Sequence, residues 1–116
     1  MVIKDTGIGN KEVLFADLEH YMRELGFDRG AWDYHHATYD YKIVDKGNVY
    51  YLRVEANVIE GKLEDTHAVL KLEEPYMGKH LFPHGLDYDS PIPDAVLKTA
   101  KNKLQMLSEK LSSHEA

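Results

Sequence analysis

The sequence predicts one α+β domain in which an antiparallel sheet of four to five strands carries two helices on one face. Two segments with one-sided apolar stripes indicate the helices, and runs of alternating apolar and polar residues between them indicate the strands. The expected order is helix, four strands, helix, with a short extra strand at residues 2–3. A chain of 116 residues suits one core, so we expect a single domain over 1–116 with a frayed tail at 111–116.

The first helix is expected over residues 11–25. Its apolar residues share one narrow sector of the helical wheel: Leu14, Leu18, Tyr21 and Leu25. Asn10 suits the cap before the first turn, and Gly26 suits the left-handed residue after the last one. Because the stripe is one-sided, this helix should cover a sheet.

The clearest strands are TYDYKIV and VYYLRVEANVI, which are separated by DKGN. A two-residue turn at Lys46 and Gly47 predicts a β-hairpin, since glycine supplies a positive φ at low cost. That turn fixes the register by pairing Val44 with Val49, and the pairs Ile43–Tyr50, Tyr41–Leu52 and Tyr39–Val54 then give one apolar, aromatic face. The other face then carries Asp40 opposite Arg53 and Thr38 opposite Glu55.

Two further strands are expected at 66–73 and within 27–36. In the segment 66–73, alternate residues should face inward: Ala68, Leu70 and Leu72. Trp32 and Tyr34 are in phase with each other but out of phase with Tyr39 and Tyr41. A turn or bulge near residues 35–38 must absorb one residue.

The second helix is expected to begin at Pro93, whose missing N–H costs nothing in a first turn. Its apolar stripe consists of Leu97, Ala100, Leu104, Leu107 and Leu111. With both helices on one face of the sheet, the opposite face should meet water or a partner.

The segment 75–93, PYMGKHLFPHGLDYDSPIP, has no apolar periodicity that would indicate a helix or strand. A long, specific loop in a small domain is typically functional or closely packed. This loop and the aromatic hairpin supply the candidate ligand-binding residues, which are Tyr39, Tyr41, Tyr76, His80, Phe82 and His84. For Tyr39, Tyr41 and Tyr50 we favour a core role, whereas Tyr51 on the open face suggests a surface for a partner or for self-association.

Composition excludes several function classes. The net charge of −6, with lysines of the second helix spread over its solvent side, argues against nucleic-acid binding. The absence of cysteine excludes disulfides, thiolate metal sites and cysteine nucleophiles. The first ten residues lack the pattern of a signal peptide, and no segment is long and apolar enough to span a membrane, so we expect a cytoplasmic protein.

His80 and His84 have an HxxxH spacing, which on a helix would place two imidazoles on one side. Pro83 lies between them and disfavours a helix there, so the spacing no longer indicates that the two imidazoles share one side. A zinc site would need a third ligand, and the candidates are His67, Asp87, Asp89, His35 and His36. We favour a structural or surface role for both histidines and predict no metal and no cofactor.

The segments GFDRGAWDYHHATYDYKI, YYLRVEANVIEG and LEEPYMGKHLFPHGLDY together resemble the YugN-like family of small bacterial proteins. The most specific parts of the resemblance lie at residues 32–42, 50–54 and 78–85. The resemblance implies a cytosolic bacterial protein with one α+β domain. It supplies neither an activity nor functional residues.

No catalytic residue is assigned, because the sequence lacks a nucleophile motif and a cofactor-binding motif. We expect a non-enzymatic binding or assembly module that uses the 75–93 loop and the open sheet face for a small molecule, a protein or a second copy of the chain. The alternative is a small hydrolase or isomerase with His80 or His84 as general base. In a third interpretation the loop plugs one end of the core with Leu81, Phe82 and Leu86.

Overall fold

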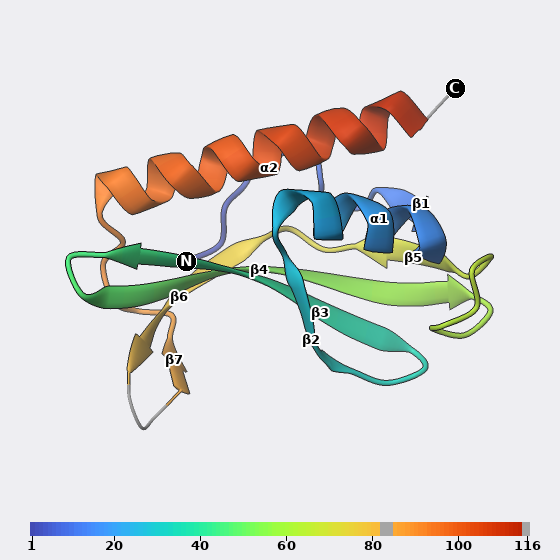
Figure 1. The fold of residues 1–116 in the computed structure, drawn as a ribbon, viewed down its shortest axis with the longest axis horizontal. Coiled ribbons are helices and arrows are strands. Elements are labelled where there is room, and N and C mark those ends of the chain that lie inside the picture. The colour runs from blue at the N-terminus through green and yellow to red at the C-terminus, as the bar shows by residue number, and fades with distance from the viewer. Residues whose placement is uncertain (82–84, 115–116) are drawn as a thin grey trace.

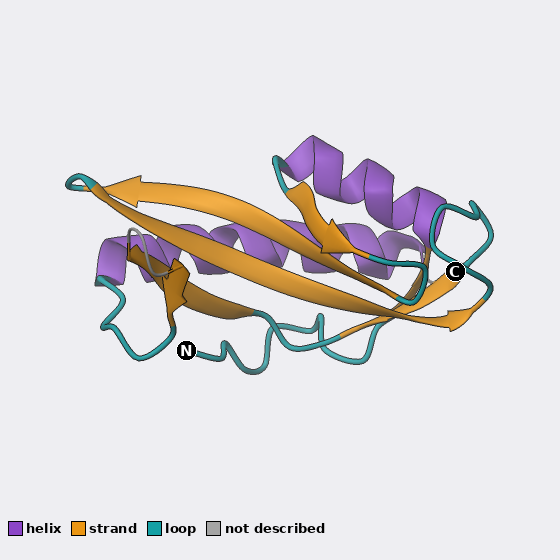
Figure 2. Ribbon diagram, turned by 90° about the horizontal axis from the view of Figure 1, so that it is seen from below, coloured by secondary structure: helices purple, strands orange, loops and turns teal. Residues whose placement is uncertain are grey.

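The computed structural model describes residues 1–81 and 85–114 and has two layers (Figure 1). Within these residues seven strands form one sheet, and both helices pack on the same face of it. The elements are β1 (Glu12–Leu14), α1 (Phe15–Leu25), β2 (Asp28–Trp32), β3 (His36–Asp45), β4 (Asn48–Glu60), β5 (Val69–Leu72), β6 (Tyr76–Leu81), β7 (Gly85–Asp87) and α2 (Asp94–His114). Seen from the other side, no helix of the described chain passes in front of the strands (Figure 2). The predicted fold class is therefore confirmed, with more strands than expected.

The long strand β4 organises the sheet. Along one edge β4 pairs with the whole of β3, from Asn48 to Asn57, and along the other edge it pairs first with β6 and then with β5. Beyond these, β2 borders β3, β1 borders β5 and β7 borders β6, and all of these pairings are antiparallel. No helix among the described residues is long and apolar enough to cross a membrane.

The β3–β4 register matches the prediction at every pair, from Thr38–Glu55 to Val44–Val49. Lys46 and Gly47 have φ values of 49° and 81°, so both central residues of the turn are left-handed, as a type I′ hairpin requires. Leu52 is 0% exposed beneath the helices, while the side chain of Arg53 on the other face is 24% exposed. The alternation of apolar and polar residues thus separates core from open face as expected.

The start of the first helix was predicted wrongly. Residues 12–14 form β1 and pair with β5, and the helix begins only at Phe15 with Leu14 as its N-cap. Asn10 has a φ of 68° and its N–H bonds to the carbonyl of Leu72 rather than capping the helix. Pairing with β5 buries Val13 and outweighs the local helical pattern. Gly26 does end the helix, with a φ of 88°.

The second helix begins at Asp94, one residue after the predicted Pro93, whose carbonyl accepts a hydrogen bond from the N–H of Leu97. Its buried stripe contains Val96 in place of Leu97, which is only partly buried. The expected frayed tail at 111–116 was wrong as far as residue 114, because α2 extends to His114 and Leu111 is buried in the core. Residues 115–116 lie outside the described part of the chain.

The remaining predictions about strands and turns are confirmed only in part. The strand expected at 66–73 is shortened to β5, because residues 65–68 form a turn closed by the N–H of Ala68 and the carbonyl of Asp65. Of the turn or bulge expected near residues 35–38, a turn is present, closed by the N–H of Asp33 and the carbonyl of His36, while the register shift lies within β2 between Arg29 and Trp32. The short strand expected at 2–3 is a single bridge between Val2 and Tyr76.

The segment 75–93 is not the irregular loop that was predicted. Its first half forms β6 against the free edge of β4, and β7 folds back on β6 as a hairpin. In Figure 1 this β6–β7 hairpin leaves the sheet on the side away from α2. Leu81 is exposed and Leu86 only half-buried, so these two residues do not plug the core, and Phe82 lies outside the described residues.

Candidate functional site

The structure divides the predicted ligand-binding residues between the two faces of the sheet. Tyr39 and Tyr41 face the helices, as the register of β3 requires. Tyr76 pairs with Arg53 and stands with His80 on the open face. Phe82 and His84 lie outside the described residues. The described members of the set therefore do not share one cavity.

On the helix side, Tyr39 is a buried hydrogen-bond donor. Its hydroxyl lies 2.8 Å from Oε2 of Glu19 on α1, and burial, together with this carboxylate, raises the pKa of Tyr39 far above its usual value. The phenol therefore stays protonated and donates. It borders a cavity of about 310 Å³ between α1 and β2 that is lined by Glu19, Met22, Arg23, Phe27, Asp28 and Arg29.

Arg29 beside this cavity is held by rings and carboxylates. Its guanidinium lies 4.6 Å from the ring centre of Trp32 and 5.4 Å from that of Phe15. Nη2 lies 2.6 Å from Oε1 of Glu64, while Nη1 is enclosed and has no hydrogen-bond partner among the described residues. The arrangement fits a cation–π support for the end of the sheet.

Tyr41 also packs within the helix layer. Its ring centre lies 5.5 Å from that of Phe27, and Nζ of Lys103 on α2 lies 4.6 Å above the ring. The ring thus fills the space between α2 and the end of α1. The core role favoured for Tyr39 and Tyr41 agrees with these contacts.

The open face has an ion pair at its centre. Nε and Nη2 of Arg53 donate to the two oxygens of Asp40 at 2.6 and 3.2 Å, and Nη1 donates to the hydroxyl of Tyr88 at 3.2 Å. The hydrogen bond to Asp40 raises the pKa of Arg53 further above its already high value. All three guanidinium nitrogens donate a hydrogen bond within the protein, so the pair favours the predicted mutual role over anion binding.

Aromatic rings surround this ion pair. Tyr76 and Tyr88 meet edge to face with ring centres 5.4 Å apart, and Tyr51 meets His80 in the same way at 6.1 Å. Burial, followed by the charge of Glu55, raises the pKa of Tyr76 to about 12. A Cβ on Gly78 would lie 3.1 Å from two ring carbons of Tyr88, so the missing side chain lets that ring lie on the strand. The rings are therefore held in place without being covered by a helix.

A second polar cluster lies further along the open face, at His36. Its Nδ1 lies 2.7 Å from Oδ1 of Asn57 and its Nε2 lies 3.2 Å from Oε1 of Glu55. Glu55 also accepts a hydrogen bond from Thr38, and Asn57 donates to Glu73. Burial lowers the pKa of His36, but the hydrogen bonds to Asn57 and Glu55 outweigh burial and raise it overall.

His80 lacks the partner that a general base needs. Its ring is exposed and meets Tyr51, and no carboxylate in the described part of the chain bonds to it. Nor do the described residues contain a group of three or more side chains suited to holding a metal ion. His84, the other histidine considered for these roles, lies outside the described residues.

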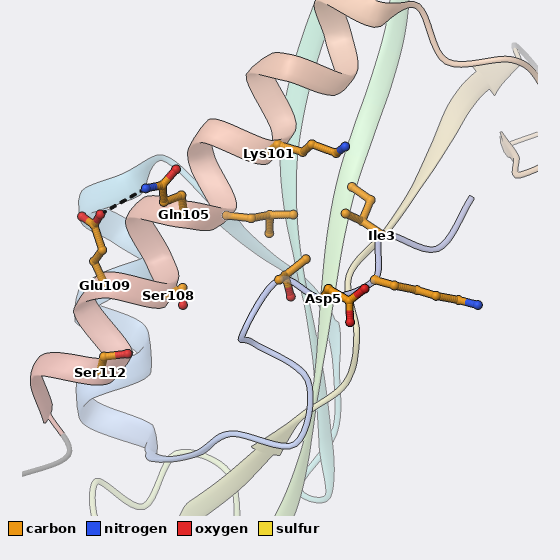
Figure 3. Close-up of a pocket in the computed structure, with 10 residues that line it drawn as sticks. Ile3, Asp5, Lys101, Gln105, Ser108, Glu109 and Ser112 are labelled. Atoms are coloured by element: carbon orange, nitrogen blue, oxygen red, sulfur yellow. Dashed lines mark hydrogen bonds between the residues drawn. The ribbon is translucent and has the colours of Figure 1, made fainter.

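A groove of about 690 Å³ runs between residues 3–6 and α2 (Figure 3). Its apolar lining residues are Ile3 and Leu104, and the side chain of Lys101 projects toward Ile3. The polar and charged lining residues are Lys4, Asp5, Thr6, Lys101, Gln105, Ser108, Glu109 and Ser112. The volume is that of a small-molecule site. Its two lysines and two carboxylates balance, so its charge favours neither anions nor cations.

Comparison with known proteins decides the family. The YugN-like family matches residues 4–110. This chain belongs to the YugN-like family. The uncharacterized protein YlbA of Bacillus subtilis is 30% identical over 112 residues, which cover 94% of this chain and 93% of YlbA. The uncharacterized protein YugN of the same organism is 31% identical over 88 residues, which cover 75% of this chain and 66% of YugN.

The fold of this YugN-like chain is also that of a solved relative. The crystal structure of the uncharacterized conserved protein YugN from Geobacillus kaustophilus HTA426 matches with a TM-score of 0.88 at 37% identity. The match covers 99% of this chain and 98% of that one. Fold and family thus agree along nearly the whole length.

Sequence reasoning missed the His36 cluster in this YugN-like protein. The sequence suggested His36 only as a third metal ligand. The cluster was missed because Glu73 comes to lie beside Glu55 only through the pairing of β5 with β4, which no local pattern specifies. One signal was present, since the predicted register already placed Thr38 opposite Glu55 and thus Asn57 opposite His36.

Proposed function

We propose that this YugN-like protein is a non-enzymatic binding or assembly module. Its contact surface would be the open face of the sheet together with the β6–β7 hairpin. The observation that carries the proposal is the pair of edge-to-face contacts, Tyr51–His80 and Tyr76–Tyr88, on the sheet face opposite α1 and α2. Large rings of this kind are typical anchors of protein interfaces.

The rings are also preorganised, which lowers the entropy lost on binding. Arg53 bonds to the hydroxyl of Tyr88 while it is itself fixed by Asp40, and Gly78 allows the ring of Tyr88 to lie against β6. Neighbouring carboxylates, cations and amides would form a polar rim around the rings. This combination supports a protein partner that binds reversibly, either a second copy of this chain or another protein.

Site-specific photo-crosslinking tests this proposal. A photoreactive phenylalanine analogue in place of Tyr51 should yield a crosslinked product, either with itself in the purified protein or with one partner in a bacterial lysate. The matched control carries the same analogue in place of Lys98, which is exposed on α2 in the helix layer. Equal products from both positions, or none from Tyr51, would count against the open face as a contact surface.

Alanine substitution gives the energetic test. Tyr51→Ala and His80→Ala should each weaken the interaction by about tenfold or more if these rings are anchors, because truncating a central aromatic commonly costs about 2 kcal/mol. Association is measured by sedimentation velocity for self-association and by calorimetry for a captured protein. Lys98→Ala should leave the affinity unchanged.

We further propose that the module acts in the cytoplasm. A chain without cysteine is suited to a reducing compartment. Fractionation of bacterial cells that produce the full chain tests this, and recovery in the membrane or secreted fraction would contradict it.

A further inference from the structure

The open face carries two pairs of carboxylates. In each pair the two residues lie directly opposite each other across neighbouring strands. Asp28 lies directly opposite Asp40 on β2 and β3. Glu73 follows β5 and its N–H bonds to the carbonyl of Glu55, which places Glu73 opposite Glu55. Carboxylates placed directly across two strands repel each other, so each pair needs a cation nearby.

The two pairs are served by different cations. Arg53 bonds to Asp40 and carries a charge at every physiological pH. Glu55 is bonded by His36, whose charge depends on pH. One pair is therefore compensated permanently and the other only while His36 holds its second proton.

The hydrogen-bond directions around His36 require a proton on each of its two ring nitrogens. Glu73 can only accept a hydrogen bond, so the amide nitrogen of Asn57 donates to it at 3.0 Å and the amide oxygen of Asn57 is left facing His36. Glu55 on the other side of the ring is also an acceptor. Both ring nitrogens therefore face acceptors, and only the imidazolium has two N–H groups to satisfy them.

We propose that the open face binds its partner in a proton-linked manner, with His36 as the titrating group. The imidazolium ties β3 to the end of β4 and offsets the repulsion between Glu55 and Glu73. Loss of its proton breaks one of the two hydrogen bonds and leaves both carboxylates uncompensated beside Tyr76. The inference rests on the proposed function, since it concerns the regulation of the same surface.

Polar and charged groups surround His36 from β4, from the end of β5 and from its own segment. On β4 it faces Glu55 and Asn57, and after β5 it faces Glu73. Lys71 on β5 lies opposite Asn57, one strand further away, and opposes the charge of the imidazolium. Along its own segment, Asp33 accepts a hydrogen bond from the N–H of His35. The groups that contact the ring directly are thus acceptors, and they favour the protonated form in agreement with its raised pKa.

The first measurement is an NMR titration of the His36 ring in the full chain. The titration midpoint should lie above the ordinary histidine value of about 6.5 and should fall in Glu55→Gln, which removes the charge but keeps the shape. A wild-type midpoint at or below the ordinary value would overturn the proposal. So would a midpoint that Glu55→Gln leaves unchanged.

The second measurement is the affinity of the open face, through the self-association or captured partner described above, at about pH 6 and about pH 8.5. Above the His36 midpoint the affinity should fall by up to about tenfold per pH unit, the limit for one linked proton. His36→Gln should remove most of this dependence. The matched control is His35→Gln, which changes the neighbouring exposed side chain. This variant should retain the pH dependence of the affinity.

The outcomes separate the two proposals. Binding of equal strength at both pH values would overturn proton linkage while leaving the binding module intact. Absence of any binding at both pH values would overturn the proposed function and the linkage with it. A pH dependence that His36→Gln retains would assign the proton to another group and overturn the role of His36.

Discussion

Nε of Arg53 lies 2.6 Å from Oδ1 of Asp40, directly across β3 and β4 on the face opposite α1 and α2. The contact is bidentate, and Asp40 is in turn opposed by Asp28 on β2. A single guanidinium therefore bonds to both oxygens of Asp40 and also to the hydroxyl of Tyr88. The centre of the open face depends on this one side chain.

Arg53→Met should destabilise the protein by about 1–3 kcal/mol, because it leaves the half-buried carboxylate of Asp40 without its donor and facing Asp28. The free energy of unfolding is measured by urea denaturation. In the double variant Asp40→Asn, Arg53→Met, part of this loss should be recovered. Strictly additive effects of the two substitutions would contradict the coupling.

Gly78→Ala should also destabilise the protein, although its cause is steric. A Cβ at this position would meet the ring of Tyr88 at 3.1 Å and Cβ of Leu86 at 3.2 Å, so the ring must move off the strand. The expected cost is about 1–3 kcal/mol in thermal or urea unfolding. Tyr88→Ala in the same chain should relieve most of the crowding, and an undiminished cost in that background would contradict this explanation.

The two faces of the hairpin should respond differently to the same truncation. Val54→Ala removes methyl groups from a residue that is 0% exposed, and should cost about 1.5–3 kcal/mol of unfolding free energy. Val44→Ala is the matched control, since Val44 is 62% exposed on the open side of the same hairpin and should change stability by about 0.5 kcal/mol or less. Similar costs at both positions would contradict the assignment of the faces.

The stability contributed by His36 should depend on pH with a defined sign. Because its pKa is raised in the folded state, the contribution is complete below the pKa of the unfolded chain and is lost as the pH rises through the folded value. The difference in unfolding free energy between wild type and His36→Gln should therefore be largest in mild acid and shrink toward alkaline pH. A difference that grows with pH would contradict the raised pKa.

The register of the central hairpin was predictable because strict alternation, a turn glycine and opposite charges at Asp40 and Arg53 all specify the same pairing. The start of α1 was not predictable, because the periodicity of residues 11–14 also fits a helix. Only pairing with the distant strand β5 makes residues 12–14 a strand. The β6–β7 hairpin was missed for a similar reason. Gly78 and the polar His80 interrupt the apolar alternation, yet pairing with β4 makes β6 a strand.

The candidate site was harder to predict than the fold. Tyr39 and Tyr41 were grouped with Tyr76 and His80 by residue type, and only the register of β6 against β4 places them on opposite faces. A residue's face follows from local alternation within one strand. Its neighbours across the sheet depend on pairings that are distant in sequence.

The two-residue turn between β3 and β4 has a consequence for how the chain folds. The ladder that it closes reaches from Asp45–Asn48 to His36–Asn57, residues only 21 apart in sequence, whereas β1 must meet β5 across about half of the chain. Closing a short loop costs less chain entropy than closing a long one. The central ladder should therefore assemble early and serve as the nucleus, with the N-terminal segment and α2 docking onto it last.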